Sequence, residues 1–323
     1  MTLDQSQASS GAHSTNIRSS SESPSPEPKK SEPHILDQAP SNLRRRKLMG
    51  AGFATSFSVV TYGLLVLLTY LIGDVFADGL KWLDLDFLNN FASRRPSRAG
   101  ISAALWGTVW LVVLTGLFAI PLGVSAGIYL EELMEESKSK EFISINIQNL
   151  AGVPSIVYGI LGLTLFVRFM SLDRSILAGA LTLSLLVLPI IIIATRESLR
   201  AIPQSIRHAA LALGATRWQT VRAHILPAAL PGILTGVILA ISRAVGETAP
   251  LIIVGAVAYI RNNPSSVMDA YTALPIQIYN WVGKPKEEFH ELAAAGIIVL
   301  LVVMIGANLT AITIRNLKQR SNI

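Results

Sequence analysis

Apolar runs of membrane-spanning length recur along the chain, and they limit its possible folds more than any other feature. Each run is near the ~20 residues that a helix needs to cross a bilayer. Hydrophobic residues make up 51% of the 323 residues and charged residues 15%, whereas about 25% of the residues in a soluble domain are charged. The sequence therefore predicts an all-α, polytopic transmembrane helical bundle and argues against a large soluble core.

The chain divides into a polar beginning and an apolar remainder. Residues 1–47 include "SSSESPSPEPKKSEP", a composition that cannot bury enough apolar surface to offset the entropy of ordering. We therefore expect a disordered tail over 1–47 and a transmembrane domain over 48–323. Within that domain six spans are predicted, at about residues 50–72, 101–130, 144–170, 175–195, 230–258 and 291–314.

The basic residues favour one orientation. "RRRK", residues 44–47, directly precedes the first span, and clustered Lys and Arg beside a span favour retention in the cytoplasm. With six spans, both the N- and C-termini are expected to be cytoplasmic. The net charge of +6 is explained by this topology, so no nucleic-acid partner is expected.

The sequence lacks the residues and motifs that several kinds of chemistry require. There is no cysteine, which excludes disulfides, thiolate nucleophiles and sulfur-ligated metal sites. There is no G-x-x-x-x-G-K-[ST] phosphate loop and no nucleophile–base pair. We therefore expect a chain that is not an enzyme and that itself binds no cofactor and no metal.

Three polar segments between the spans have structural interpretations. "LKWLDLDFLNNF" (80–91) has apolar residues at helical spacing and either lies flat in the interface or packs as a short covering helix on the bundle. Tyr271, Tyr279 and Trp281 suit an aromatic belt at the membrane surface. The acidic "EELMEESKSKE" (131–141) is interpreted as a solvated cytoplasmic turn.

The loop over about 196–228 is longer than a simple connection needs to be. Its residues predict a helix that ends at Gly214 in a left-handed conformation. A second helix is expected from Thr216 to about Ile225, stopped by Pro227 and Pro231. Such a hairpin, with Arg217, Trp218 and Arg222 on its surface, suits docking into a groove of another protein.

One ion pair lies within an apolar span, in "SRAVGETAP" (242–250). Arg243 and Glu247 are four residues apart and share a helix face of small and polar residues, which points to the bundle interior or a water-filled path. A kink is expected between Gly246 and Pro250. Each intramembrane charge costs about 2.5–3.5 kcal/mol, whereas an i, i+4 pair returns only about 0.2–0.5 kcal/mol.

Two interpretations of this pair remain open. In one, Arg243 is a structural clamp on a neighbouring span. In the other, Arg243 supplies positive charge to an anion path and Glu247 holds its rotamer, with the hydroxyls of Ser242 and Thr248 as weaker candidates. Arg suits phosphate because its planar fork donates two hydrogen bonds at once.

Several motifs resemble one family. Permeases of ATP-binding-cassette (ABC) transporters carry E-A-A-x3-G-x9-I-x-L-P in a cytoplasmic loop. His208 and His224 depart from this pattern at its Glu and Ile positions, and the other residues keep its register: Ala209, Ala210, Gly214, Leu226 and Pro227. "PLGVSAGIYLEE" (121–132), "NLAGVPSIVYG" (149–159) and "RAVGETAPLIIVGA" (243–256) are similar to the A-type permease subunits of bacterial phosphate-specific ABC transporters.

The resemblance implies a type I importer permease fold in the bacterial inner membrane, surrounded by lipid. It implies a second homologous permease, two ATPase subunits that use ATP, and an extracytoplasmic phosphate-binding protein. It associates Arg243 and Glu247 with the passage of phosphate. Alternatives are a permease for another oxyanion, such as sulfate or molybdate, and a secondary transporter that works alone.

Overall fold

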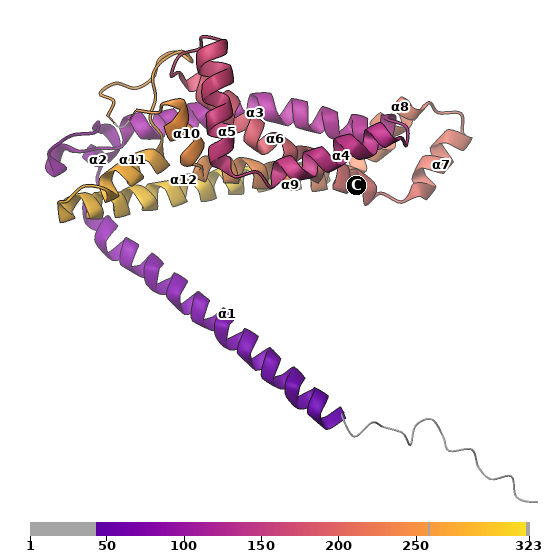
Figure 1. Cartoon of the computed structure of the whole chain (residues 1–323), viewed down its shortest axis with the longest axis horizontal. Helices are drawn as coiled ribbons and strands as arrows, with labels where there is room; N and C mark the ends of the chain where they lie inside the picture. The colour runs from indigo at the N-terminus through magenta and orange to yellow at the C-terminus, as the bar shows by residue number, and fades with distance from the viewer. Residues whose placement is uncertain (1–42, 258, 321–323) are drawn as a thin grey trace, which may run out of the picture. The chain divides into compact units, whose positions relative to one another are not determined.

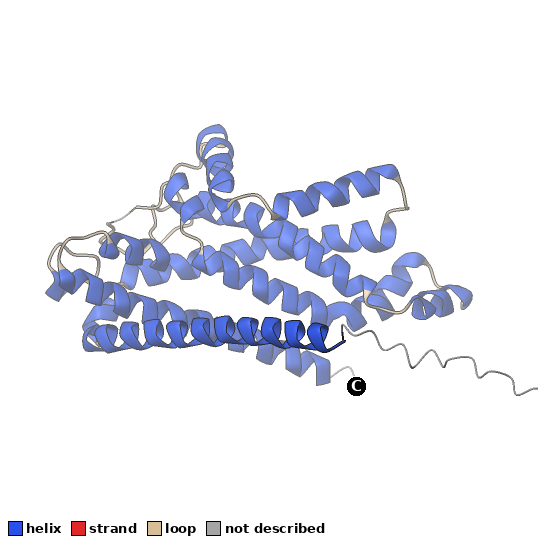
Figure 2. Cartoon of the chain, turned by 60° about the horizontal axis from the view of Figure 1, so that its bottom comes forward, coloured by secondary structure: helices blue, strands red, loops and turns tan. Residues whose placement is uncertain are grey.

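The computed structural model describes residues 43–257 and 259–320, which form helices joined by loops (Figures 1 and 2). In this part of the chain there is no β-strand, only one isolated antiparallel bridge between Ser175 and Ala270. The all-α prediction is confirmed. Five helical stretches are long and apolar enough to cross a membrane, and one bent helix pair could supply a sixth span.

Contacts divide the chain into two units, with the boundary between Leu64 and Leu65 inside α1 (Leu43–Gly79). The described part of the first unit is the beginning of this helix, and its side chains from Arg46 onward are exposed. The helix includes residues 43–47, so the predicted tail is too long by those residues. The rest of the predicted tail lies outside the described residues.

The second unit is built on long helices: α3 (Ser102–Ile128), α6 (Ile176–Arg200), α9 (Leu226–Gly246) and α12 (Glu287–Arg320). Glycines allow α3 and α6 to approach closely. A Cβ on Gly123 would lie 2.7 Å from Cγ2 of Ile191, and one on Gly127 would lie 2.7 Å from Cβ of Thr195. The predicted spans 101–130, 175–195 and 291–314 all fall on these helices.

The predicted span 144–170 is divided into two helical halves in the structure. The first half is α4 (Lys138–Ala151), and the second is α5 (Ser155–Gly162) with a π-helical turn η5 (Leu163–Phe169). The two halves are bent by 102° at the break. Pro154 has φ −55° and ψ 137°, and a proline disfavours helical backbone in the residue before it. The Gly152–Pro154 sequence therefore ends one helix and starts another.

The predicted span 230–258 is also broken. Its helical part begins earlier, continues through α9, and resumes after two residues as α10 (Ala249–Val254). The short helices α5 and α10 then pack against each other, because Gly159 has no side chain there. A Cβ on Gly159 would lie 2.8 Å from Cα of Pro250 and 3.0 Å from Cβ of Ile253. Two broken helices thus support one another.

The polar segments form a cap at one end of this unit (Figure 1). It contains η2 (Leu80–Trp82), α2 (Leu85–Asn89), η3 (Pro96–Arg98) and α11 (Leu274–Val282). Phe87 is buried beside Trp281, with ring centroids 5.9 Å apart. The first segment is therefore a covering helix packed on the bundle. Tyr271 and Trp281 are buried as well, so the aromatic-belt interpretation is wrong for these two and stays a prediction for the exposed Tyr279.

Candidate functional site

The charged pair lies where α9 ends. Glu247 leaves the helix with φ −74° and ψ 128°, directly after Gly246. Pro250 lies in the first turn of α10, where its missing N–H and fixed φ are tolerated. The predicted kink is therefore a complete break, and Pro250 begins a new helix instead of bending a continuous one.

Arg243 and Glu247 contact each other across this break. Nε of Arg243 lies 3.3 Å from Oε1 of Glu247, and the two side chains are 50% and 16% exposed. Arg243 therefore lies at the surface of this chain, which does not fit the interior of the chain's own bundle and leaves the other predicted alternative, a water-filled path, as a prediction. A half-exposed Arg at such a place needs water, a lipid headgroup or a partner chain, since hydrocarbon would solvate it poorly.

The two hydroxyl candidates differ in their surroundings. Oγ of Ser242 lies 2.7 Å from the carbonyl of Ile238 and 2.5 Å from Oδ1 of Asn308. It is therefore engaged in the contact between α9 and α12. Thr248 is partly buried and precedes α10, and its side chain caps no backbone N–H of that helix. Of the two, Thr248 is the more available donor beside the pair.

At the opposite end of the unit from the cap lies the predicted hairpin (Figure 1). Its first helix, α7 (Gln204–Ala212), ends at Gly214 with φ 85°. The amide of Gly214 donates to the carbonyl of Leu211, and that of Ala215 donates to the carbonyl of Ala210. These two bonds make a Schellman motif, and the predicted left-handed end at Gly214 is confirmed.

The second half of the hairpin differs from the prediction. Thr216 and Gln219 form a capping box at the start of α8 (Arg217–Thr220), and a π-helical turn η6 (Val221–Ile225) follows. This turn passes directly into α9, with Pro227 in its first turn and Pro231 inside it. The predicted stop at these prolines is wrong, because the helical backbone continues from η6 past Pro227 and Pro231 to Gly246.

The hairpin presents a surface that suits docking. Leu213 is 90% exposed and Trp218 is 52% exposed. Within the predicted coupling set Ala210 is buried and Leu226 partly buried, and the exposed members are His208, Ala209, Gly214, Arg217, Trp218, Arg222 and Pro227. Large apolar side chains at a solvent-exposed tip indicate a binding surface.

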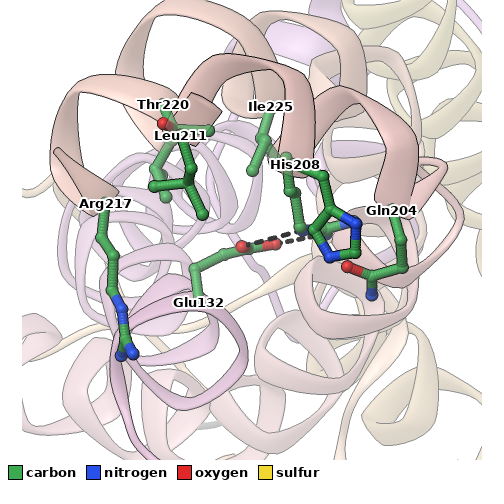
Figure 3. A pocket seen from close by; sticks show the side chains of 9 residues that line it. Glu132, Gln204, His208, Leu211, Arg217, Thr220 and Ile225 are labelled. Atoms are coloured by element: carbon green, nitrogen blue, oxygen red, sulfur yellow. Dashed lines mark hydrogen bonds and ion pairs between the residues drawn. The ribbon is translucent and has the colours of Figure 1, made fainter. Parts of the chain in front are cut away.

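A cavity of about 170 Å³ lies between the two helices of the hairpin (Figure 3). Its lining includes Gln204, His208 and Leu211 from α7 and Arg217 from α8, and Glu132 reaches it from η4 (Tyr129–Leu133). η4 is the π-helical continuation of α3. The hairpin is thus held over the end of α3.

Glu132 holds the hairpin through Arg207. Oε2 of Glu132 accepts from Nε of Arg207 at 3.1 Å, and Oε1 accepts from Nη2. The two side chains are 7% and 13% exposed. The hydrogen bond with Glu132 raises the pKa of Arg207, against an opposing effect of burial, so Arg207 stays charged.

Its neighbour Glu131 bridges to α6. Oε2 of Glu131 lies 3.2 Å from Nε of the buried Arg196, and Oε1 lies 2.7 Å from Nε of Arg200. The interpretation of 131–141 as a solvated turn is therefore wrong for Glu131 and Glu132, and it is also wrong at its end, where α4 begins at Lys138 and Lys140 is buried. One signal in the sequence indicates that Glu131 and Glu132 have basic partners. Acidic side chains at the C-terminal end of a helix oppose its dipole, so two of them there indicate basic partners.

Metal chemistry finds no support in the described part of the chain, where no group of three or more His, Cys, Asp or Glu residues is placed to hold an ion. The departures His208 and His224 are both exposed. What the arrangement offers is a docking hairpin tied to α3 and α6, and an ion pair at a helix break.

Comparison with known proteins identifies the family. The family model "Binding-protein-dependent transport system inner membrane component" matches residues 119–320. This region contains both the hairpin and the charged pair. A probable ABC transporter permease protein of Bacillus subtilis, YqgI, is 34% identical over 206 residues, covering 64% of this chain and 69% of that protein.

A phosphate transport system permease protein, PstA 1 of Mycobacterium tuberculosis (strain CDC 1551 / Oshkosh), is 32% identical over 286 residues. The match covers 85% of this chain and 91% of that protein. PstA of Yersinia pestis is 32% identical over 273 residues, covering 83% of this chain and 90% of that protein.

Among solved structures, a bacterial ABC transporter that imports the acidic polysaccharide alginate has a chain with TM-score 0.59 and 18% identity, covering 85% of this chain and 97% of its own. A chain of the MetNI methionine ABC transporter has TM-score 0.56 and 19% identity, covering 67% of this chain and 94% of its own. The predicted importer permease fold is confirmed, and the chain belongs to the family of binding-protein-dependent transport system inner membrane components.

Proposed function

We propose that this chain is a permease subunit of an ATP-driven importer of inorganic phosphate. It would form the translocation path with a second, homologous permease and receive phosphate from an extracytoplasmic binding protein. Two ATPase subunits would hydrolyse ATP and bind the hairpin around Gly214. The chain would lie in the bacterial inner membrane, with both of its termini in the cytoplasm.

The observation that carries the proposal is the position of Arg243. It lies at a helix break, half-exposed at the surface of a single chain. If a water-filled path ran between two permeases, that surface would line it, and water would solvate the charge of Arg243 inside the membrane. The guanidinium could then donate two hydrogen bonds to one tetrahedral oxyanion.

Glu247 would have a second role beside it. Its carboxylate contacts Nε of Arg243 at 3.3 Å, which orients the guanidinium. It also offsets the positive charge, so an anion would bind weakly enough to leave again. Thr248 would add a hydroxyl donor beside the pair. Similarity to PstA proteins supports phosphate as the anion.

The exposed residues of the hairpin support the proposal that an ATPase subunit binds there. Leu213 and Trp218 project from it, and the basic side chains of Arg217 and Arg222 are exposed beside them. His208 replaces the acidic residue of the family motif, so the groove that receives this hairpin is expected to be complementary to a basic surface.

Uptake of radiolabelled phosphate by the assembled transporter in ATP-loaded vesicles tests the proposal. Unlabelled phosphate should compete with the label, and equal concentrations of sulfate or molybdate should not. Competition by sulfate or molybdate would assign another oxyanion. Uptake that survives removal of the ATPase subunits would show a secondary transporter instead.

A further inference from the structure

One side chain, Arg207 in the hairpin, joins three segments. Its Nε and Nη2 contact the carboxylate of Glu132 at the end of α3. Its Nη1 donates to the carbonyl of Ile202 at 2.7 Å, and Nη2 donates to the carbonyl of Leu199 at 2.8 Å. Arg207 therefore binds a carbonyl in the last turn of α6, a carbonyl in the connection that follows it, and the end of α3 at once.

These contacts matter because of how the chain is connected. The hairpin is covalently continuous with α6 on one side, through residues 201–203, and with α9 on the other, through η6. It has no covalent connection to α3 nearby. Side chains alone join the hairpin to that helix. Two ion pairs connect them: Glu132–Arg207, which is nearly buried, and Arg217–Glu135, which is 4.0 Å long and exposed.

The burial of the pair makes it a rigid joint. Both side chains are nearly buried, and a buried charge that loses its partner is strongly unfavourable. Sliding the hairpin over η4 would break the bidentate contact. A second bridge, from Glu131 to Arg196 and Arg200, fixes the end of α3 to α6 in the same place.

We infer that Glu132 and Arg207 are positioning residues that make the hairpin and the ends of α3 and α6 move as one body. Displacement of the hairpin by a partner would then turn α3 and α6 together, instead of tilting the hairpin alone. This inference rests on the proposed function, because it assumes a nucleotide-dependent partner on the hairpin. It adds the contact through which that movement reaches α3.

The test compares Glu132→Gln with Glu135→Gln in the assembled transporter. Both remove one carboxylate from the same segment, but Glu135 is 84% exposed and makes only the long contact to Arg217. The measurements are co-purification of the ATPase subunits and phosphate moved per ATP hydrolysed. A third is the distance between spin labels on Tyr129→Cys and Ser205→Cys, without nucleotide and with ATP trapped. The chain has no cysteine of its own, so both labels are unique to it.

The expected result is specific to Glu132→Gln. The ATPase subunits still co-purify, phosphate moved per ATP falls about fivefold or more, and the label distance becomes broader or shifts with nucleotide. In the wild type and in Glu135→Gln the distance is the same in both states. Equal transport per ATP in the two variants, or an unchanged narrow distance in Glu132→Gln, would overturn the inference.

A failure of Glu132→Gln to assemble has its own test. The double variant Glu132→Gln, Arg207→Gln removes both buried charges together, which avoids the cost of an unpaired one. If it assembles and remains uncoupled, the inference holds. If it is coupled like the wild type, or also fails to assemble, the pair only stabilises the fold and the inference is wrong. Absence of phosphate uptake by the wild type would reject the proposed function alone, because the label distances do not depend on the substrate.

Discussion

The left-handed end of α7 offers the cleanest mechanical test of the hairpin. Gly214 has φ 85°, and a Cβ placed on it would meet nothing within 4 Å. The substitution Gly214→Ala therefore creates no clash with other residues. Its whole cost is the backbone conformation, which is about 1–2 kcal/mol for an L-residue in the left-handed region.

That cost is large for a local structure of this size. A change of one to two kcal/mol alters a folded-to-unfolded ratio by about 5–30-fold. The Schellman bonds of Gly214 and Ala215 should open more often by that factor. Asn adopts left-handed backbone more readily than Ala, so Gly214→Asn should lose clearly less.

Hydrogen exchange of the assembled transporter, followed by mass spectrometry, measures this opening. Peptides covering residues 204–225 should exchange about 5–30-fold faster in Gly214→Ala. A matched control is Gly63→Ala in α1, where a Cβ also meets nothing and φ is not positive. This control substitution should leave the exchange rates of the hairpin peptides unchanged. Equal effects of Ala and Asn at 214, or no effect of Ala, would refute the argument from backbone conformation.

Two further predictions concern packing and pH. A Cβ on Gly162 would lie 2.1 Å from Oγ1 of the fully buried Thr182, so Gly162→Ala should lower the thermal midpoint by an overpacking cost of about 1–3 kcal/mol. Adding Thr182→Ala should recover part of it, and no recovery would contradict the clash. Backbone hydrogen bonds from Ser265 and Ser266 lower the pKa of Asp269, so its stabilisation of that turn is present at neutral pH and lost as pH falls below about 3.9. Exchange protection of residues 259–273, corrected for intrinsic rates, should therefore be constant from neutral pH to about pH 5 and drop as the pH falls below about 3.9, and an equal drop in Asp269→Asn would assign the effect to another group.

The features that the sequence predicted well depend on local chemistry. Apolar runs of spanning length fixed the all-α fold. Gly214 ends its helix as expected because no neighbour competes with its backbone preference. The break near Gly246 and Pro250 was also predicted, although as a kink and not as two helices.

The errors have local causes in the helices and, for the acidic residues, partners that are distant in sequence. Pro227 and Pro231 predict the end of a helix, but the π-helical turn η6 leads directly into α9. The local sequence predicts solvated side chains for Glu131 and Glu132, because their arginine partners lie 65–75 residues further along the chain. The break between α4 and α5 follows from the local Gly152–Pro154 sequence, but the size of the bend, 102°, is not indicated by that pattern.

The hairpin and the charged pair lie at different places in the second unit, and the proposed function needs both. The hairpin would receive movement from the ATPase partner, and Glu132–Arg207 would pass it to α3. The break between α9 and α10 would place Arg243 where the path opens to water. The central claim is that Arg243 takes part in moving the anion.

Phosphate uptake by the assembled transporter in vesicles, compared between wild type and Arg243→Ala with the ATPase rate recorded in parallel, tests this claim most directly. The proposal predicts that Arg243→Ala assembles and hydrolyses ATP while uptake falls strongly, and that Arg243→Lys, which keeps the charge but loses the planar fork, lies between the two. Normal uptake by Arg243→Ala would contradict the anion path, and loss of assembly would instead make Arg243 a structural clamp between helices.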